Sequence, residues 1–286
     1  MPYQSQFRSG SFAGKIALIT GAGSGIGRCC AHELASLGAT VILLGRDAAK
    51  LECVAAEIRE DGGSADQTVC DIREEQAVRM VVEQIVAHHG RLDLLVNNAG
   101  GQFPAPLENI SARGWQAVLN TNLMGGFLVA RECYTQSMKP HRAGAIVNII
   151  ADMWHGMPGM GHSGAARAGM LNFTETAASE WRPVRVNAVA PGWIASSGMD
   201  SYPEATRPMI RNLPTHVPLG RIGNEAEVSA AIVFLLSDGA AFINGSCLRV
   251  DGGAPNVRRH YPMVPTVASP SFEGFHRAVT ADIFKD

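Results

Sequence analysis

Short hydrophobic runs alternate along the chain with longer segments in which apolar positions recur every three to four residues. The first pattern predicts buried strands and the second predicts amphipathic helices. The expected strands are residues 15–20, 40–44, 66–70, 92–97, 144–150, 184–190 and 246–250. The expected helices are residues 25–37, 48–61, 74–89, 111–138, 164–180 and 225–236. Their alternation predicts a parallel sheet with helices on both faces.

Two segments fall outside this alternation. Residues 195–221 contain four prolines, which exclude one long helix, and they follow the sixth expected strand, where a cover over a substrate would lie. Residues 254–286 are rich in proline and aromatic residues and are expected to wrap a neighbouring subunit or the chain's own site. Residues 12–253 form the expected core of a single domain, as is common for α/β folds of this length.

Composition narrows the class of protein. With 286 residues, 46% of them apolar, the chain can bury one large core. Its net charge of -2 is scattered, and no basic patch or run of about 20 apolar residues occurs, so neither nucleic acid nor a membrane is an expected partner. The polar start of the chain is unlike a secretory signal, which predicts a cytoplasmic protein. Six cysteines without a CxxC pair predict reduced thiols and no metal site.

A glycine-rich turn lies between the first expected strand and the first expected helix. Gly21 suits the tight turn, while Gly25 and Gly27 permit close approach of the backbone to a pyrophosphate and to the sheet. The helix that follows presents free N–H groups and the positive end of its dipole to such an anion. Glycines also mark ordinary turns, so their placement between strand and helix is what predicts a dinucleotide site.

The stretch Thr20-Gly21-Ala22-Gly23-Ser24-Gly25-Ile26-Gly27, together with Asn97-Asn98-Ala99-Gly100, resembles the short-chain dehydrogenase/reductase superfamily. The resemblance implies a Rossmann-type, doubly wound α/β fold with seven parallel strands in the order 3-2-1-4-5-6-7. It also implies an oxidoreductase with a nicotinamide cofactor, Asp71 against the adenine and the backbone of Ile194 against the carboxamide. The implied cofactor contacts are Gly21, Ser24, Gly25, Ile26, Gly27, Asp71, Ile72, Asn98, Ala99, Gly100, Pro191, Gly192 and Ile194.

The same resemblance implies an assembly. In the superfamily, the helices that correspond to residues 111–138 and 164–180 pair across a two-fold axis, and here both carry small residues that permit close approach. These small residues are Gly125, Gly126, Ala165, Ala168 and Gly169. A homotetramer is expected, with a dimer as the alternative.

The end of the second expected strand indicates which nicotinamide cofactor is used. Enzymes specific for NAD place an acidic side chain there, whereas the 2′-phosphate of NADP needs a cation. This chain has Gly45 and Arg46 at these positions, which favours NADP(H). NAD(H) is the alternative if Arg46 is only a surface charge and Asp47 turns toward the ribose.

The catalytic segment departs from the superfamily at three positions. Ser163 stands where the usual tyrosine lies, and Arg167 stands where the usual lysine lies. The upstream serine falls at Ile150 or Ala151, neither of which has a hydroxyl group. A serine hydroxyl is too weak an acid to replace the tyrosine, and arginine keeps its proton, although it can still hold a ribose.

Three further polar residues are candidates for the catalytic site. Asn122 matches a superfamily asparagine that locally breaks its helix and orders water or substrate; the alternative is an ordinary buried asparagine. His162 is a candidate because histidine is the residue type best suited to acid–base work, and Asp152 stands close by, although a histidine beside a helix start is more often a surface or capping residue. Ser163 has a structural alternative too, as the cap of the helix expected from residue 164.

These departures match a narrower resemblance. Residues 97–103, 114–119, 146–150 and 162–169 are similar to the peroxisomal trans-2-enoyl-CoA reductase branch, which reduces the C=C bond of a thioester with NADPH and is related to the 2,4-dienoyl-CoA reductases. Other stretches, such as GGQFPAPL and PGWIASSGMDSY, are similar to bacterial proteins labelled citronellol or citronellal dehydrogenases. The expected substrate is therefore a small molecule, either an acyl-CoA or a terpenoid.

Three functions are compatible with these residues. Reduction of an enoyl thioester is preferred, because hydride addition forms an enolate that needs hydrogen-bond donors, and Asn122 and Ser163 can supply them. Oxidoreduction of a branched terpenoid alcohol or aldehyde is the second, but its usual acid or base is missing. The third is a cofactor-binding protein with little turnover.

Overall fold

A computed structural model describes residues 2–196, 198–199, 202, 204–257 and 267–284. Its centre is a seven-stranded parallel sheet in the order β3-β2-β1-β4-β5-β6-β9, which confirms the predicted Rossmann-type fold and strand order. The strands are β1 (Ile16–Thr20), β2 (Thr40–Gly45), β3 (Ser64–Val69), β4 (Leu94–Asn97), β5 (Ala145–Ile149), β6 (Arg185–Pro191) and β9 (Cys247–Val250). Every predicted strand is present, with ends that differ by at most two residues.

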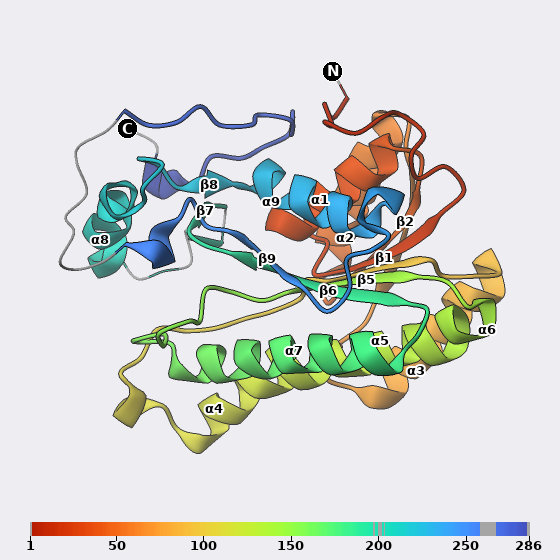
Figure 1. Ribbon diagram of the computed structural model, residues 1–286, viewed down its shortest axis with the longest axis horizontal. Helices are drawn as coiled ribbons and strands as arrows, with labels where there is room; N and C mark the ends of the chain where they lie inside the picture. Colours follow the sequence, from red (N-terminus) through yellow and green to blue (C-terminus); the bar gives the residue numbers. More distant parts are fainter. Residues whose placement is uncertain (1, 197, 200–201, 203, 258–266, 285–286) are drawn as a thin grey trace.

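Helices cover both faces of the sheet (Figure 1). Each face has its own hydrophobic cluster. One face carries α1 (Gly25–Ser36), α2 (Ala48–Glu60) and α9 (Glu225–Leu236). The other carries α3 (Glu75–His89), α4 (Ala112–Leu119), α5 (Gly126–Cys133), α6 (Lys139–His141) and α7 (Gly161–Glu180). In the part of the chain described here, no helix is both long and apolar enough to cross a membrane.

The long helix predicted at residues 111–138 is present, but its hydrogen-bonding pattern changes twice. The π-helix η2 (Asn120–Gly125) separates α4 from α5, and a second π-helix, η3 (Tyr134–Met138), follows α5. A π-helix inserts an extra residue in a turn and is common at functional sites. Asn122 lies in η2, which confirms that the regular helix is interrupted there.

Short elements occupy the segment after β6. The prolines exclude a long helix as predicted: α8 (Arg207–Asn212) has only six residues, with Pro208 in its first turn. Strands β7 (Ile194–Ala195) and β8 (Gly223–Asn224) form a separate two-stranded sheet. These strands are too short to show a hydrophobic period in the sequence. Residues 197, 200–201 and 203 of this segment lie outside the described residues. The 3₁₀ turns are η1 (Leu107–Asn109), η5 (Glu204–Thr206), η6 (Leu213–His216), η7 (Asp238–Ala240), η8 (Ala254–Asn256) and η9 (Asp282–Phe284).

The C-terminal strap, residues 267–284, packs on its own chain. Near α1 and α2, the guanidinium of Arg277 forms an ion pair with Asp61 at 3.0 Å, and the N–H of Gln4 donates to the carbonyl of Gly274 at 2.9 Å. Farther along, Ala281 and Ile283 enter a small hydrophobic cluster with α8. The extension was expected to wrap a neighbouring subunit or the chain's own site, and this strap is observed to pack on its own chain, while residues 258–266 lie outside the described residues.

Two small-residue positions do not have the exposed role that the sequence suggested. A Cβ atom at Gly125 would lie 2.7 Å from the side chain of Ile72, and one at Gly126 would overlap the methyl group of Met170. Both glycines are buried and permit packing inside the chain, so the prediction that they form an exposed pairing surface is wrong. Ala165 and Ala168 do lie exposed on α7.

Glu225, the first residue of α9, is a buried acid beside the start of α1. Its side chain is 6% exposed, and Oε1 lies 3.8 Å from the place where a Cβ of Gly25 would be. Burial raises the pKa of Glu225 from an ordinary 4.5 to about 7, although Arg28 works in the opposite direction. The carboxylate form is therefore destabilising in the folded protein.

Glu225→Gln is expected to stabilise the protein at pH 8 but not at pH 4.5. The pKa of about 7 in the folded protein exceeds the ordinary value. The stability that depends on the protonated acid is therefore fully present below pH 4.5 and is lost as pH rises through 7. The gain at pH 8 is up to about 3 kcal/mol. Thermal denaturation from pH 4.5 to 8 measures it, with the exposed Glu180→Gln as the control. An equal effect of Glu225→Gln at both pH values would contradict the prediction.

Candidate active site

The turn between β1 and α1 has the conformation that its glycines allow. Gly21 and Gly25 have φ angles of +65° and +58°, in the left-handed region that favours glycine. At Gly27 the constraint is space: a Cβ would overlap the carbonyl oxygen of Gly21 and lie 2.6 Å from Nδ2 of Asn98. Ser24 is the N-cap of α1, but its side chain makes no capping bond. The first N–H groups of the helix can therefore receive an anion, which is the fit expected for a dinucleotide pyrophosphate.

The end of β4 is bonded directly to this turn. Thr20 Oγ1 accepts hydrogen bonds from the backbone N–H groups of Asn98 and Ala99, both at 2.9 Å. The side-chain amide of Asn98 donates to the carbonyls of Thr20 at 3.0 Å and Gly21 at 3.3 Å. The two strand ends that would border a cofactor thus form one rigid unit. The sequence motif predicted Asn98 at this place, but it did not predict that Thr20 would join the two strand ends.

Two charged residues, Arg46 and Asp47, follow the end of β2. Arg46 is exposed and makes no hydrogen bond or ion pair with any residue that the structure describes. The carboxylate of Asp47 instead caps α2 by accepting the N–H of Lys50 at 3.1 Å. One carboxylate oxygen of Asp47 is therefore engaged in the helix cap in this structure.

Asp71 and Ile72 follow β3 on the same edge of the sheet. The Arg73 side chain binds Asp71 through both carboxylate oxygens, and this contact, aided by Arg46, lowers the pKa of Asp71 to about 2. Asp71 is thus an anion whose position is fixed by Arg73. Ile72 is buried against η2, the helix segment that carries Asn122.

Asn122 holds the loop that follows β4. Its side chain is 2% exposed, Oδ1 accepts the N–H of Gly101 at 2.8 Å, and Nδ2 donates to the carbonyl of Gly101 at 3.0 Å. This reciprocal pair fixes the backbone at Gly101 from the π-helix. The observed bonds agree with the alternative of a satisfied buried asparagine, and they also place the following residue, Gln102, at the site.

Ser163 does not cap a helix. Helix α7 begins at Gly161, three residues earlier than predicted, so Ser163 lies within the first turn and the capping interpretation is wrong. Ser163 is fully buried, and its Oγ donates to the side-chain Oε1 of Gln102 at 2.7 Å. Gln102 was not singled out in the sequence, although its place directly after β4, at the carboxyl end of a central strand, is where ligand-binding loops of such sheets lie.

Among the residues that the structure describes, no acidic side chain pairs with the cation Arg167. One guanidinium nitrogen donates to the carbonyl of Ile149 at 2.7 Å, while Nε is buried and has no hydrogen-bond partner. Burial lowers the pKa of Arg167 to about 10. Any Cβ at Gly100 would lie 2.6 Å from Nη2, so the glycine of the Asn97–Gly100 motif leaves room for this guanidinium. An unneutralised donor at this place fits the hydroxyl groups of a cofactor ribose.

His162 and Asp152 also carry buried polar atoms without partners. His162 is fully buried; its Nδ1 accepts the N–H of Ser163 at 2.8 Å, and its Nε2 is unpaired. Asp152 Oδ1 is unpaired as well, and burial raises the pKa of this acid. Four side-chain atoms of this kind occur in the described residues, and three of them belong to Asp152, His162 and Arg167. Their concentration in one segment is typical of a ligand-binding site.

The stretch from Pro191 to Ile194 closes the opposite side of the site. Pro191 is the last residue of β6 and Ile194 begins β7. Gly192 donates its N–H to the carbonyl of Val250 at 2.9 Å, and a Cβ there would lie 2.8 Å from the Cα of Asp251. The residues implied for the carboxamide thus lie at the carboxyl ends of β6 and β9.

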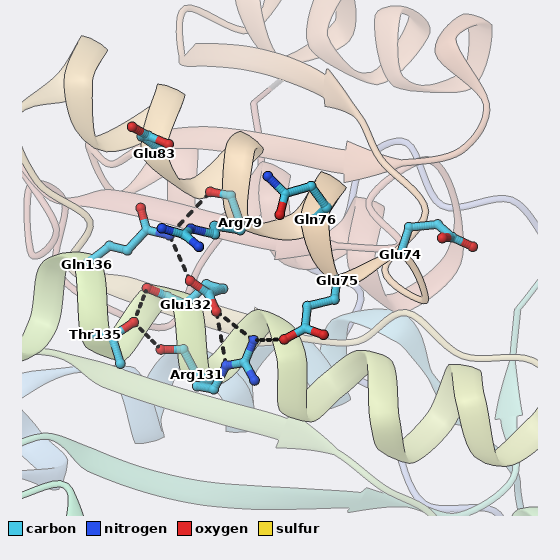
Figure 2. Close-up of a pocket in the computed structure, with 9 residues that line it drawn as sticks. All are labelled: Glu74, Glu75, Gln76, Arg79, Glu83, Arg131, Glu132, Thr135 and Gln136. Atoms are coloured by element: carbon cyan, nitrogen blue, oxygen red, sulfur yellow. Dashed lines mark hydrogen bonds and ion pairs between the residues drawn. The ribbon is translucent and has the colours of Figure 1, made fainter.

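A second, separate groove lies between α3 and the α5–η3 helix, with a volume of about 690 Å³ (Figure 2). Three of its charged side chains pair with one another: Arg131 binds Glu75 at 2.7 Å and Glu132 at 2.8 Å. None of the predicted site residues lines it. The groove therefore lies outside the candidate active site.

A group of potential metal ligands lies at the edge of the sheet. The donor atoms of Asp66, His88 and His89 are within 4.8 Å of one another, and His89 Nε2 lies 3.3 Å from Asp66 Oδ2. Asp66 belongs to the edge strand β3, and the two histidines end α3. The group is partly exposed and shares no residue with the candidate active site.

Known proteins are similar to this chain over most of its length. Residues 21–255 match the protein family described as Enoyl-(Acyl carrier protein) reductase. A curated relative from Bacillus subtilis (strain 168), named "Probable 2,4-dienoyl-CoA reductase", is 38% identical over 244 residues, which cover 84% of this chain and 96% of the relative.

Solved structures give the same picture. The citronellol catabolism dehydrogenase (AtuB) of Pseudomonas aeruginosa PAO1 is 60% identical, with a TM-score of 0.80, and the match covers 88% of this chain and 99% of that one. An actinorhodin polyketide ketoreductase solved with NADPH is 30% identical, with a TM-score of 0.82, over 87% of this chain and 100% of that one. With its strand order, its glycine turn and these matches, the chain belongs to the short-chain dehydrogenase/reductase family of nicotinamide-dependent oxidoreductases.

Proposed function

We propose that this enzyme uses NADPH to reduce the C=C bond of a 2-enoyl thioester such as an enoyl-CoA. The observation that carries this proposal is the joint replacement of the family's tyrosine and lysine by Ser163 and Arg167. Ser163 is buried in a hydrogen-bond network, and Arg167 is a donor without an anionic partner. Such a site offers hydrogen bonds to a developing negative charge rather than a titrating acid.

The chemistry of enoyl reduction suits these groups. Bound NADPH supplies a hydride to Cβ, and the charge that develops on the thioester oxygen needs donors, each worth roughly 3 kcal/mol in such sites. We assign Arg167 to the ribose and Asp152 or His162 to proton supply at Cα. The sequence made Asn122 and Ser163 donors to the enolate, but Asn122 Nδ2 already donates to Gly101 and Ser163 Oγ to Gln102, so we assign both residues to positioning the loop after β4. Burial raises the pKa of Asp152, which favours a protonated acid in the site.

A terpenoid aldehyde or alcohol is the second candidate substrate. It is favoured by the 60% identity to a protein named for citronellol catabolism. The missing tyrosine argues against it, because alcohol oxidation requires a base for the hydroxyl proton.

Two assays on the purified enzyme separate these candidates. NADPH consumption with crotonyl-CoA and with a longer 2-enoyl-CoA tests the first, and NADPH consumption with citronellal, or NAD(P)⁺ reduction with citronellol, tests the second. A kcat/KM for enoyl-CoA at least tenfold above that for citronellal supports the proposal. Turnover of the terpenoid alone would overturn it.

We propose NADP(H) as the cofactor on the basis of Arg46. Arg46→Ala is expected to weaken NADPH binding by about tenfold or more while leaving NADH nearly unchanged, because a charge-assisted contact to the 2′-phosphate is worth about 1.5–3 kcal/mol. Fluorescence titration of both cofactors measures this. Lys50→Ala on α2 is the control for loss of a nearby positive charge. Equal losses for NADPH and NADH in Arg46→Ala would remove Arg46 from the assignment.

We also propose a homotetramer in the cytoplasm, with the exposed small residues Ala165 and Ala168 of α7 in the pairing surface. Light scattering at micromolar protein concentration tests this assembly, and a monomer would exclude it.

A further inference from the structure

Three side chains from distant parts of the chain form a continuous hydrogen-bonded series next to the catalytic segment. Ser163 Oγ donates to Gln102 Oε1 at 2.7 Å, and Gln102 Nε2 donates to the phenolic oxygen of Tyr202 at 3.2 Å. These residues come from α7, the loop after β4, and the segment after β6. A tyrosine is thus present near the position from which the family's tyrosine is missing, but it comes from another element.

The direction of these bonds determines which proton is available. A serine hydroxyl has one hydrogen, and that of Ser163 is used on Gln102. Gln102 uses one of its N–H groups on Tyr202, so the phenol oxygen accepts. The phenolic hydrogen takes part in neither bond. In this arrangement Tyr202 has a donor to offer to a ligand, whereas Ser163 does not.

The ring of Tyr202 is supported by packing. It lies against a hydrophobic cluster of α8 and the C-terminal strap, formed by Met199, Ile210, Leu213, Ala281 and Ile283. The guanidinium of Arg211 donates to the carbonyl of Ile283 at 2.9 Å and joins the strap to α8. The ring of Tyr202 is therefore fixed by hydrophobic packing, while its hydroxyl group is hydrogen-bonded to Gln102.

Gln102 is positioned from the opposite side. Asn122 holds the preceding residue, Gly101, through two backbone hydrogen bonds. The neighbouring Phe103 ring packs at 4.4 Å, edge to face, against His162. The residues on both sides of Gln102 are thus held in place, Gly101 by Asn122 and Phe103 by His162.

We propose that Tyr202 is a catalytic residue that donates a hydrogen bond to the reacting oxygen of the substrate, and that Gln102 is the positioning residue that orients it. The inference builds on the proposed function, since an enoyl thioester carries such an oxygen. It also applies to an aldehyde, so the two proposals can fail separately.

Tyr202→Phe tests the donor. This change keeps the ring and its packing and removes only the hydroxyl group, so kcat with crotonyl-CoA should fall by roughly a hundredfold or more, as in the loss of one oxyanion donor. The NADPH Kd and the Tm should stay unchanged. Tyr134→Phe is the matched control, because Tyr134 stacks on Trp181 at 4.5 Å in a different part of the molecule. Wild-type kcat in Tyr202→Phe would overturn the proposal.

Gln102→Met tests the positioning role through a double-mutant cycle. Methionine has nearly the same length but neither bond, so kcat should fall in the wild-type background. In the Tyr202→Phe background the same change should have less than about a twofold further effect, because its partner is already absent. A purely structural role of Gln102 would instead give the full loss in both backgrounds, which would overturn the coupling.

The design separates the two proposals. If the wild type turns over citronellal but not enoyl-CoA, the proposed function fails and the same variants are measured with citronellal. If neither substrate is turned over, calorimetry of crotonyl-CoA binding to the complex of enzyme and NADP⁺ replaces kcat. Tyr202→Phe should then weaken that binding while Tyr134→Phe does not, and equal affinity in all three proteins would overturn the proposal.

Discussion

Gly27→Ala is expected to weaken NADPH binding by at least about 100-fold, because two phosphate contacts worth about 1.5–3 kcal/mol each would be lost. The added methyl group would overlap the carbonyl oxygen of Gly21 and lie 2.6 Å from Nδ2 of Asn98. Both neighbours belong to the rigid unit that Thr20 holds together, so neither can move without displacing the turn. The start of α1 must then leave the position that fits a pyrophosphate.

Fluorescence titration with NADPH measures this effect, with thermal denaturation of the same variant to follow the loss of stability. Gly239→Ala is the matched control, since Gly239 lies in η7 and its nearest neighbour is the movable hydroxyl of Ser237 at 3.3 Å. A Gly27→Ala protein that binds NADPH within tenfold of the wild type would show that the turn tolerates the side chain.

Arg167→Met is expected to act in opposite directions on binding and stability. The NADPH Kd should rise about ten- to a hundredfold, because hydrogen bonds from a charged donor are worth about 1.5–3 kcal/mol. The protein without cofactor should become more stable by up to about 3 kcal/mol, since burial lowers the pKa of Arg167 to about 10 and methionine carries no buried charge. The loss of the bond to Ile149 offsets part of this gain.

Melting temperatures with and without NADPH measure both effects. Arg185→Met provides the contrast: burial also lowers the pKa of Arg185, but its guanidinium donates to the carbonyls of Leu235, Leu236 and Ser237. That variant should be less stable, because three carbonyl groups lose their partner. If Arg167→Met also melts lower without cofactor, Arg167 has a structural role and the assignment to a ligand is wrong.

The framework of the fold follows from local pattern. Hydrophobic periodicity gave all seven strands of the main sheet, and the conformational demands on Gly21 and Gly25 are also local, so the turn before α1 could be placed from the sequence. The strands β7 and β8 could not, because two residues each are too few to show a period. Their pairing depends on the tertiary approach of two distant segments.

The hydrogen bonds around Ser163 also join segments that are distant in the sequence. Gln102 and Ser163 are 61 residues apart, and Gln102 and Tyr202 are 100 residues apart. The resemblance to the family directed attention to Ser163, Arg167 and Asn122, because these occupy the family's catalytic positions. It did not point to Tyr202, because this proposed hydrogen-bond donor lies at a position that the family's pattern does not include. Buried glycines were misjudged for a similar reason, since Gly126 faces Met170 from another helix.

The C-terminal strap has a consequence for the order of folding. Its contacts join residues made far apart: Arg277 and Asp61 are separated by 216 positions, and Arg28 and Arg277 by 249. Contacts of such long range form late, after the local βα units have built the sheet. The packing behind Tyr202 is therefore complete only after Ala281 and Ile283 have docked.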